Sequence, residues 1–281
     1  MRRQHSAPID YLVIGHVTQD VTPNGLTLGG TVTYAARTAL ALGCRVAVVT
    51  SAAPDLELDS VLAGIDLMCL PAKATTTFEN LYTPAGRRQV LHARADSLDP
   101  SAVPPAWRKP TIVHLGPLAN ECDPHLIDCF SDSLIGVTPQ GWMRRWDANG
   151  HVSKGEWVDA AEWLPKVDAA VISLEDVQDE QASIARLTQL APILAVTLGP
   201  QGCTVHAGDA RRHIPVVPRA SVDPTGAGDI FAAAFFVRLW QTDDPWQAAE
   251  FANSVAALSV DRSGWASTPT AAEIGLILER Y

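Results

Sequence analysis

The sequence has little of what disulfide-bonded, zinc-binding, membrane-spanning or nucleic-acid-binding proteins need. Its five cysteines are odd in number and form no CxxC pair, which argues against a disulfide framework or a zinc site. Nowhere are there about 18 uninterrupted apolar residues, and the apolar run 11–15 is too short for a signal peptide. The net charge of −10, with only short basic pairs, argues against a nucleic-acid surface. We therefore expect a cytoplasmic protein whose partners are small molecules, with no nucleic acid and no membrane.

What is present is the pattern of an α/β domain. Short apolar segments rich in β-branched residues predict buried strands at 11–17, 45–50, 111–116, 134–139, 167–173 and 192–199. Helical spacing of apolar residues follows the first strand over 28–43, and the chain turns helical again past residue 221. This alternation predicts a largely parallel sheet covered by helices on both faces.

One segment departs from the alternation. Residues 74–95 read as two strands around the turn TPAG, with one polar face, and 21–28 reads as a third strand. We expect one domain over 1–281, with a small β lid built from about 17–30 and 72–95.

The stretch SVDPTGAGDIFAAAFFVRLW (221–240) places two glycines directly before a long apolar helix. Gly226 and Gly228 let the backbone approach a ligand, and the amides of Gly226, Ala227 and Gly228 would be unpaired at the helix start, where the dipole favours an anion. Asp229 beside that anion suits phosphoryl transfer to an alcohol, because a carboxylate can take the hydroxyl proton. The spacing alone is equally consistent with a tight turn followed by an acid in the first turn of a helix.

Here the sequence resembles a known family. DPTGAGD (223–229) is similar to the C-terminal signature of the ribokinase (PfkB) family of carbohydrate and nucleoside kinases. Four further segments resemble motifs of that family in the right order: GHVTQD (15–20), LGGTVTYAARTALALG (28–43), TLGPQGC (197–203) and FANSVAALSV (251–260). The resemblance implies a ribokinase-like, doubly wound, mostly parallel sheet with helices on both faces and a small β lid. It also implies an ATP-dependent kinase that uses Mg²⁺.

The resemblance also implies roles for individual residues. Asp229 becomes the catalytic base, with the amides of 226–228 as the anion hole. The acceptor site would be lined by Asp20, Gly29 and Gly30. The nucleotide would lie against Thr197, Gly199, Gly202, Asp223, Thr225 and Asn253. Simpler alternatives remain: a strand-end acid at Asp20, a helix-start turn at the glycine pair, a hairpin turn at GPQG (199–202), and a helix–helix hydrogen bond or core position for Asn253.

Two positions depart from the family pattern. Tyr34 stands where many members have an asparagine, which changes the acceptor pocket. SLED (173–176) stands for the family's Asn-x-x-Glu, so that Asp176 takes the place of the glutamate, with Glu175 as a neighbouring candidate. Because hydrated magnesium accepts oxygen ligands through water, a shorter carboxylate can still serve.

Loops at the same predicted edge of the sheet supply further candidates. TPQGWMRRWD (138–147) offers Gln140 and Arg144 and resembles the QGxxR variant of inositol-kinase-like members, although a surface arginine is an alternative. Glu121 ends the segment HLGPLANE (114–121) and is a further substrate-binding candidate, whereas His114 reads as a packed strand residue. In the lid, Thr77, Phe78 and Asn80 could close over the substrate, or the lid could be a structural sheet or a homodimer contact.

The sequence therefore predicts an ATP-dependent kinase that phosphorylates a hydroxyl of a small sugar or polyol, with an inositol-like acceptor favoured. The alternatives are a nucleoside or ribose kinase of the same family and a non-catalytic sugar or nucleotide sensor on the same scaffold. A dinucleotide oxidoreductase is disfavoured because no GxGxxG follows the first strand.

Overall fold

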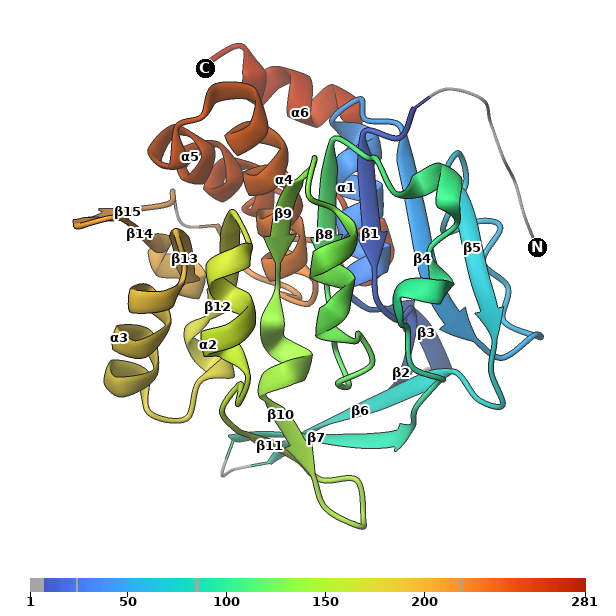
Figure 1. The fold of residues 1–281 in the computed structure, drawn as a ribbon. Coiled ribbons are helices and arrows are strands. Elements are labelled where there is room, and N and C mark those ends of the chain that lie inside the picture. The colour runs from blue at the N-terminus through green and yellow to red at the C-terminus, as the bar shows by residue number, and fades with distance from the viewer. Residues whose placement is uncertain (1–7, 24, 84–85, 218) are drawn as a thin grey trace.

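The computed structural model describes residues 8–23, 25–83, 86–217 and 219–281. Its centre is a nine-stranded sheet in the order β15-β14-β13-β12-β9-β8-β1-β4-β5 (Figure 1). The seven strands from β13 to β5 run parallel, and β14 and β15 are antiparallel at one edge. The strands are β1 (Tyr11–Ile14), β4 (Val46–Ala52), β5 (Asp66–Pro71), β8 (Ile112–Leu115), β9 (Leu134–Val137), β12 (Ala169–Ser173), β13 (Ile193–Thr197), β14 (Cys203–Ala207) and β15 (Ala210–Ile214).

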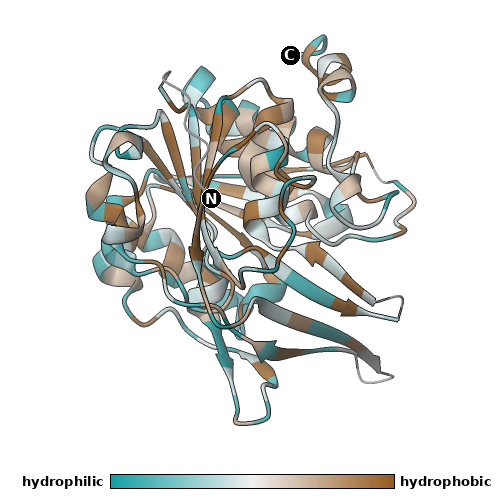
Figure 2. Ribbon diagram, turned by 90° about the vertical axis from the view of Figure 1, so that its right-hand side faces the viewer, coloured by the Kyte–Doolittle hydropathy of each residue, from teal (hydrophilic) through white to brown (hydrophobic). Residues whose placement is uncertain are grey.

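Alternate residues of the central strands enter two separate cores. Tyr11 and Val13 of β1 pack against one set of helices, while Leu12 and Ile14 face the other side. Because both faces of these strands are covered, they read as continuous apolar runs. In Figure 2 the central strands are accordingly mostly brown. All six predicted strands are present, and the predicted ribokinase-like fold is confirmed.

The two faces are covered in different ways. One carries α1 (Thr31–Ala41), α4 (Ala227–Thr242), α5 (Pro245–Ala256) and α6 (Ala271–Leu278). The other carries α2 (Ala160–Trp163), α3 (Glu180–Leu190) and several 3₁₀ turns, including η1 (Pro100–Ala102), η2 (Pro105–Trp107), η3 (Pro124–Cys129) and η4 (Pro139–Met143). Each of these four turns has proline at its start, where the fixed φ suits a first turn and the missing N–H costs nothing. No described helix is long and apolar enough to cross a bilayer.

A second, four-stranded sheet lies across the carboxyl ends of the central strands (Figure 1). Its order is β3-β2-β6-β7, with β2 (Thr18–Thr22), β3 (Gly25–Gly29), β6 (Thr76–Thr83) and β7 (Gly86–Ala93). β2 runs parallel to β6 and the other pairs are antiparallel. The small β sheet is present where the sequence predicts a lid, but the predicted third strand (21–28) is not one strand, because it spans the end of β2 and the start of β3. The middle of the TPAG turn (84–85), Asn24 in the third strand and residues 1–7 of the predicted domain lie outside the described residues.

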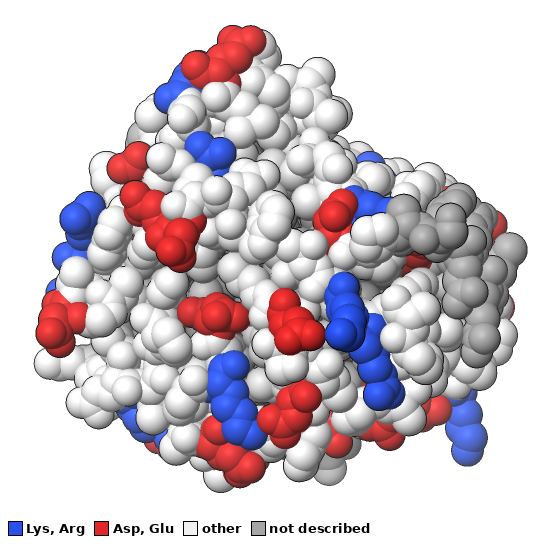
Figure 3. Space-filling model, turned by 45° about the horizontal axis from the view of Figure 1, so that its top comes forward, with Lys and Arg blue, Asp and Glu red and all other residues white. Residues whose placement is uncertain are grey.

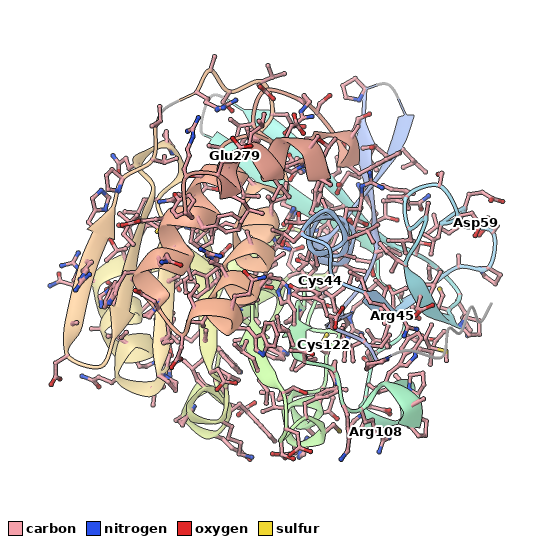
Figure 4. The ribbon with its side chains drawn as sticks, turned by 90° about the horizontal axis from the view of Figure 1, so that it is seen from above. Cys44, Arg45, Asp59, Arg108, Cys122 and Glu279 are labelled. Atoms are coloured by element: carbon pink, nitrogen blue, oxygen red, sulfur yellow. The ribbon has the colours of Figure 1, made fainter. Side chains whose placement is uncertain are left out.

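At the end opposite the lid, Arg45 joins three parallel strands. Its backbone N–H donates to Asp10 Oδ2 (2.8 Å) just before β1, and its guanidinium donates to Asp66 Oδ2 (2.7 Å) at the start of β5. Figure 4 looks down on this end and labels Arg45 beside Cys44. All five cysteines are unpaired, and burial raises the pKa of the Cys44 thiol to about 11, so this thiol is protonated at neutral pH.

Charges on the face that Figure 3 shows are interspersed rather than grouped by sign. Several exposed ion pairs join one acid to one base, as in Lys166–Asp128 (2.9 Å) and Lys109–Asp132 (3.5 Å), and one linked group joins Arg219, Asp261, Arg262 and Glu273. Such pairs contribute little to stability because water screens them.

The lid is attached to the central sheet by a buried polar chain. The Ala95 N–H donates to Thr76 Oγ1 (2.9 Å), which lies 2.7 Å from His16 Nδ1, and His16 Nε2 lies 2.9 Å from the carbonyl oxygen of Asp96. A carbonyl can only accept, so Nε2 carries the proton and the Thr76 hydroxyl donates to Nδ1. His16 follows β1, so this chain fixes where β6 and β7 leave the core.

We predict that Thr76→Val lowers the free energy of unfolding by about 1–3 kcal/mol, because it leaves a buried amide and a buried imidazole nitrogen without partners. Urea unfolding measures the change. Thr77→Val is the control, since the half-buried Thr77 hydroxyl only donates to the carbonyl oxygen of Thr75 (2.9 Å). An equal effect of the two substitutions would contradict the special role of Thr76.

Candidate active site

The predicted site residues gather where the central strands end beneath the lid. β1 and β8 are neighbours in the sheet, but the chain continues from β1 to β4 on one side and from β8 to β9 on the other. This is the topological switch point of a doubly wound sheet, where loops part and ligands bind. The starts of α1 and α4 meet at the same edge, because both helices pack on the same face of the sheet.

The start of α4 has the conformation that the GAG motif predicts, with one correction. Gly226 has φ of +81°, and a Cβ there would lie 2.4 Å from Cδ1 of Tyr34, so only glycine fits. A Cβ at Gly228 would meet no atom within 4 Å, which leaves its backbone open to a ligand. Among the described residues the amides of Gly226 and Gly228 have no acceptor, whereas the Ala227 N–H donates to the carbonyl oxygen of Pro224 (3.1 Å). The expectation that Ala227 offers a free amide is therefore wrong.

Asp229 is half-buried in the first turn of α4. Loss of solvent raises the pKa of its carboxyl to about 6, and the negative charge of Asp176 adds to the rise. A hydrogen bond from the Thr31 hydroxyl and the charge of Arg144 act in the opposite direction. A carboxylate with such a pKa can exchange a proton near neutral pH. Thr31 was not predicted, although it directly follows the glycine pair.

Asp20 and the glycine pair lie together on the acceptor side. A Cβ at Gly29 would be 2.4 Å from Oδ2 of Asp20, so the bare backbone makes room for the carboxylate. Gly30 precedes α1 with φ of +92°, and a Cβ there would lie 2.7 Å from the carbonyl oxygen of His16. The glycine pair therefore forms the turn that starts α1, and the same turn brings the backbone of Gly29 close to the Asp20 carboxylate. The register places Asp20 opposite Phe78, on one face of the lid.

Gln140 and Asp176 contact each other across two loops. Gln140, in η4, donates from Nε2 to Asp176 Oδ1 (2.5 Å), and the Ser173 N–H donates to Oδ2 (2.9 Å). A carboxylate has about four lone-pair positions, so Asp176 can still accept hydrogen bonds from a hydrated cation. Glu175 is exposed beside it. Within the described ranges no three His, Cys, Asp or Glu side chains form a direct metal site. These residues fit magnesium held through water, and not a closed cage of ligands.

Arg144 links the site to the lid. It begins β10 (Arg144–Trp146), which pairs with β11 (Val152–Lys154), and donates from Nη1 to the carbonyl oxygen of Leu118 (3.0 Å). Its guanidinium carbon lies 5.3 Å from the centre of the Phe78 ring. Phe78 is buried against Leu91 and Leu118. It therefore anchors the lid rather than being free to close over a substrate.

Glu121 has a structural role that was not predicted. Its side chain is 1% exposed and accepts hydrogen bonds from the amides of His16 (3.1 Å to Oε1), Leu118 (3.0 and 2.9 Å to the two oxygens) and Ala119 (2.6 Å to Oε2). It thus shapes the loop after β8 from inside, and its predicted role in substrate binding stays a prediction. Sequence reasoning missed this because the bound amides become neighbours only in the folded chain.

The nucleotide-side residues are partly used by the protein itself. Asn253 is buried and donates from Nδ2 to the carbonyl oxygen of Ile214 (3.0 Å), an internal hydrogen bond of the kind that the sequence analysis left open as an alternative to nucleotide binding. Gly202, with φ of +91°, turns the β13–β14 hairpin, and a Cβ there would lie 2.2 Å from the same carbonyl oxygen. Gly199 has φ of +57° and open space around it.

The remaining candidates lie on the surrounding loops. The Thr197 hydroxyl donates to the carbonyl oxygen of Ile172 (3.3 Å), which leaves it able to accept. Asp223 Oδ1 accepts from the Thr225 N–H (2.9 Å) and fixes the turn before the GAG motif. His114 lies beneath the site between the Tyr11 hydroxyl (2.8 Å) and Thr138 Oγ1 (2.9 Å), and burial lowers its pKa to about 3. It is a packed strand residue, as predicted.

Comparisons with known proteins agree with this architecture. The model of the pfkB family carbohydrate kinases matches residues 154–271. The chain is 27% identical over 250 residues to a cytidine kinase of Thermococcus kodakarensis, which covers 81% of this chain and 87% of that one. It is 32% identical over 131 residues to an inositol 3-kinase of Zea mays, covering 46% of this chain and 34% of the relative.

Solved structures show the same fold over almost the full length. A pyrophosphate-dependent kinase of the ribokinase family, complexed with a pyrophosphate analogue and myo-inositol, superposes with a TM-score of 0.80 at 22% identity, covering 95% of this chain and 99% of the other. Fold and matches together define a sugar or nucleoside kinase. The chain is thus similar to the pfkB, or ribokinase, family of carbohydrate kinases in sequence and in fold.

We predict that Glu121→Gln lowers the free energy of unfolding by about 2–3 kcal/mol, because the amide NH₂ turns a donor toward buried N–H groups. Denaturant unfolding measures the change. Glu175→Gln is the control, since that side chain is exposed and should change stability by less than about 0.5 kcal/mol. Unchanged stability of Glu121→Gln, together with a raised KM for the acceptor, would favour the substrate-binding role.

Proposed function

We propose that this protein transfers a phosphoryl group from ATP to a hydroxyl of a small polyol, with inositol-like acceptors favoured. The observation that carries the proposal is the pairing of Asp229, whose pKa is raised to about 6, with the unpaired amides of Gly226 and Gly228 at the same helix start. An acid that can take a proton beside donors that can bind an anion is the arrangement that phosphoryl transfer to an alcohol requires.

The reaction follows from these positions. The acceptor hydroxyl lies between Asp20 and Asp229, and Asp229 removes its proton as the oxygen bonds to the terminal phosphorus. The bond from that phosphorus to the bridging oxygen breaks, and the leaving group departs with the electron pair. The N–H groups of Gly226 and Gly228 donate hydrogen bonds to the moving phosphoryl oxygens and so stabilise the negative charge that spreads over them. A hydrated magnesium ion held through Asp176 would neutralise charge on the donor phosphates.

The acceptor side favours a compact molecule with many hydroxyls. Asp20 can accept two hydroxyl hydrogen bonds, and the guanidinium of Arg144 and the amide of Gln140 add donors across the site. The solved relative complexed with myo-inositol and the maize inositol 3-kinase support this choice. The archaeal cytidine kinase supports a nucleoside as the alternative acceptor.

Pyrophosphate is the second candidate for the phosphoryl donor. Two residues that were expected to meet the nucleoside are taken by internal contacts, since Asn253 and Gly202 both lie against the carbonyl oxygen of Ile214. A donor without a nucleoside needs neither of them. The pyrophosphate-dependent relative supports this alternative.

A homodimer through the lid remains a proposal. Leu26 of β3 and Leu81 of β6 are 60% and 40% exposed. The register places them on the same face, opposite to the one that carries Asp20 and Phe78. A second copy could cover this outer face without blocking the site.

We predict phosphorylated product for at least one inositol in a screen of donors (ATP, pyrophosphate) against acceptors (inositols, cytidine, ribose, fructose) with Mg²⁺. Mass spectrometry of the acceptor is the readout, because it does not depend on the donor. Product from cytidine alone would replace the polyol by the nucleoside. Binding of an acceptor without any product, seen as a thermal shift, would favour the sensor.

We predict that kcat/KM rises about tenfold per pH unit below about pH 6 and levels off above it. The reason is that Asp229 must be ionised to accept a proton and its pKa is raised to about 6. Asp229→Asn should lower kcat by about 10²-fold or more at every pH and leave donor affinity within about twofold. At pH 7 the Asp229 carboxylate is ionised, and its loss of solvent lowers the free energy of unfolding of the wild-type protein. Asp229→Asn removes this charge and should therefore be more stable than wild type at pH 7, by the order of 1 kcal/mol. Near-normal turnover of the folded variant would remove the base assignment.

A further inference from the structure

Tyr34 reaches from one helix start to the other. It lies one turn into α1, where its N–H donates to the carbonyl oxygen of Gly30 (3.3 Å), and helical side chains lean back toward the N-terminus of their helix. Its ring packs flat against the backbone at Gly226, since a Cβ there would be 2.4, 2.5 and 2.6 Å from Cδ1, Cε1 and Cγ. The side chain is therefore held against the loop that carries the unpaired amides.

The Tyr34 hydroxyl lacks a hydrogen-bond partner within the described part of the chain, although the residue is only 2% exposed. Buried tyrosine hydroxyls normally find a partner, as that of Tyr11 does with His114 (2.8 Å). The oxygen is also not sealed inside the protein, because it is not among the inaccessible unpaired atoms, which include Ser51 Oγ and Trp157 Nε1. A small group in the site can therefore reach this donor.

The surrounding charges keep this hydroxyl protonated. Loss of solvent raises the pKa of Tyr34 well above its ordinary value, and the charges of Asp20, Asp229 and Asp223 raise it further. Deprotonation would add a fourth negative charge to the site. The phenol thus remains a neutral hydrogen-bond donor over the whole working pH range.

We propose that the Tyr34 hydroxyl donates a hydrogen bond to the phosphoryl group in transit, next to the amides of Gly226 and Gly228. The contact with Gly226 holds the ring against the loop that carries the unpaired amides, and the charge of Asp20 acts on the hydroxyl more strongly than that of Asp229, so the phenol lies between the phosphoryl side and the acceptor side. An uncharged hydrogen-bond donor suits this position, because the Asp229 carboxylate becomes neutral when it accepts the proton of the acceptor hydroxyl. This proposal rests on the proposed kinase function.

The test compares Tyr34→Phe, which keeps the ring against Gly226 and removes only the oxygen, with wild type under the donor and acceptor identified by the screen. We expect kcat to fall about 10- to 100-fold, since removal of one such donor costs up to about 10²–10³ in other enzymes. The KM for the acceptor should stay within about twofold. The melting temperature should not fall, because the hydroxyl makes no hydrogen bond to any residue that the structure describes.

Tyr11→Phe is the matched control. It removes another buried phenol oxygen from the same core, but one that bonds to His114, so it should lower stability and leave kcat of the folded enzyme within about twofold. Unchanged kcat in Tyr34→Phe, or a raised acceptor KM at unchanged kcat, would overturn the proposal while leaving the kinase function intact. A wild-type protein that phosphorylates nothing in the screen would instead overturn the kinase function.

Discussion

The site depends on two helices that begin at the same place. α1 and α4 both start at the carboxyl edge of the sheet, and each start needs a glycine with positive φ, Gly30 and Gly226. The contact between them is so close that the Tyr34 ring of one helix fills the space where a side chain at Gly226 would lie. Because both positions are sterically determined, the amides at the head of α4 and the carboxylates around them are fixed before any ligand arrives. Such preorganisation is the main source of electrostatic catalysis.

The same arrangement concentrates negative charge, which the protein balances only in part. Asp176 raises the pKa of Asp229, while Arg144 and the Thr31 hydroxyl lower it. The positive end of the α4 dipole adds a further favourable field for anions. A phosphate donor brings still more negative charge, which a cation bound with the donor would offset. Asp176, tied by Gln140 and the Ser173 amide but with lone pairs left, stands where such a cation can be held through water.

Local signals explain what could be predicted from the sequence. The six strands were marked by runs of β-branched residues, and the start of α4 by glycines next to an acid, so both could be located. β5, the β10–β11 hairpin and the 3₁₀ turns over one face were not predicted. β10 and β11 have three residues each, too few for a period to show, and the four 3₁₀ turns named above, of three to six residues, are too short for a helical period.

Roles that depend on packing could not be predicted in the same way. Glu121, Asn253 and Phe78 carry polar or aromatic groups at positions next to the site, and sequence reasoning named Glu121 and Asn253 as candidate ligand-binding residues and Phe78 as a lid residue that could close over the substrate. The structure instead uses each inside the protein, because a buried amide or carbonyl needed a partner or a strand needed an anchor. The number of buried backbone groups that a loop will leave unpaired is a property of the folded chain, and no local pattern records it.

The internal contacts are distributed unevenly between the two sides of the site. On the acceptor side the internal contacts hold loops in place. Glu121 shapes the loop after β8, and the hydrogen bond between His16 and Thr76 fixes the base of the lid near Asp20. On the donor side the internal contacts involve residues that were expected to meet the nucleotide. Asn253 donates a hydrogen bond to the carbonyl oxygen of Ile214, and the backbone of Gly202 lies close to the same oxygen. A rigid, polar acceptor side is suited to discriminate between arrangements of hydroxyl groups, because a misplaced hydroxyl leaves buried polar atoms unpaired. On the donor side the Thr197 hydroxyl can still accept a hydrogen bond and Gly199 has open space around it, so this side keeps polar and backbone groups within reach of a ligand even though the Asn253 Nδ2 donor is already used.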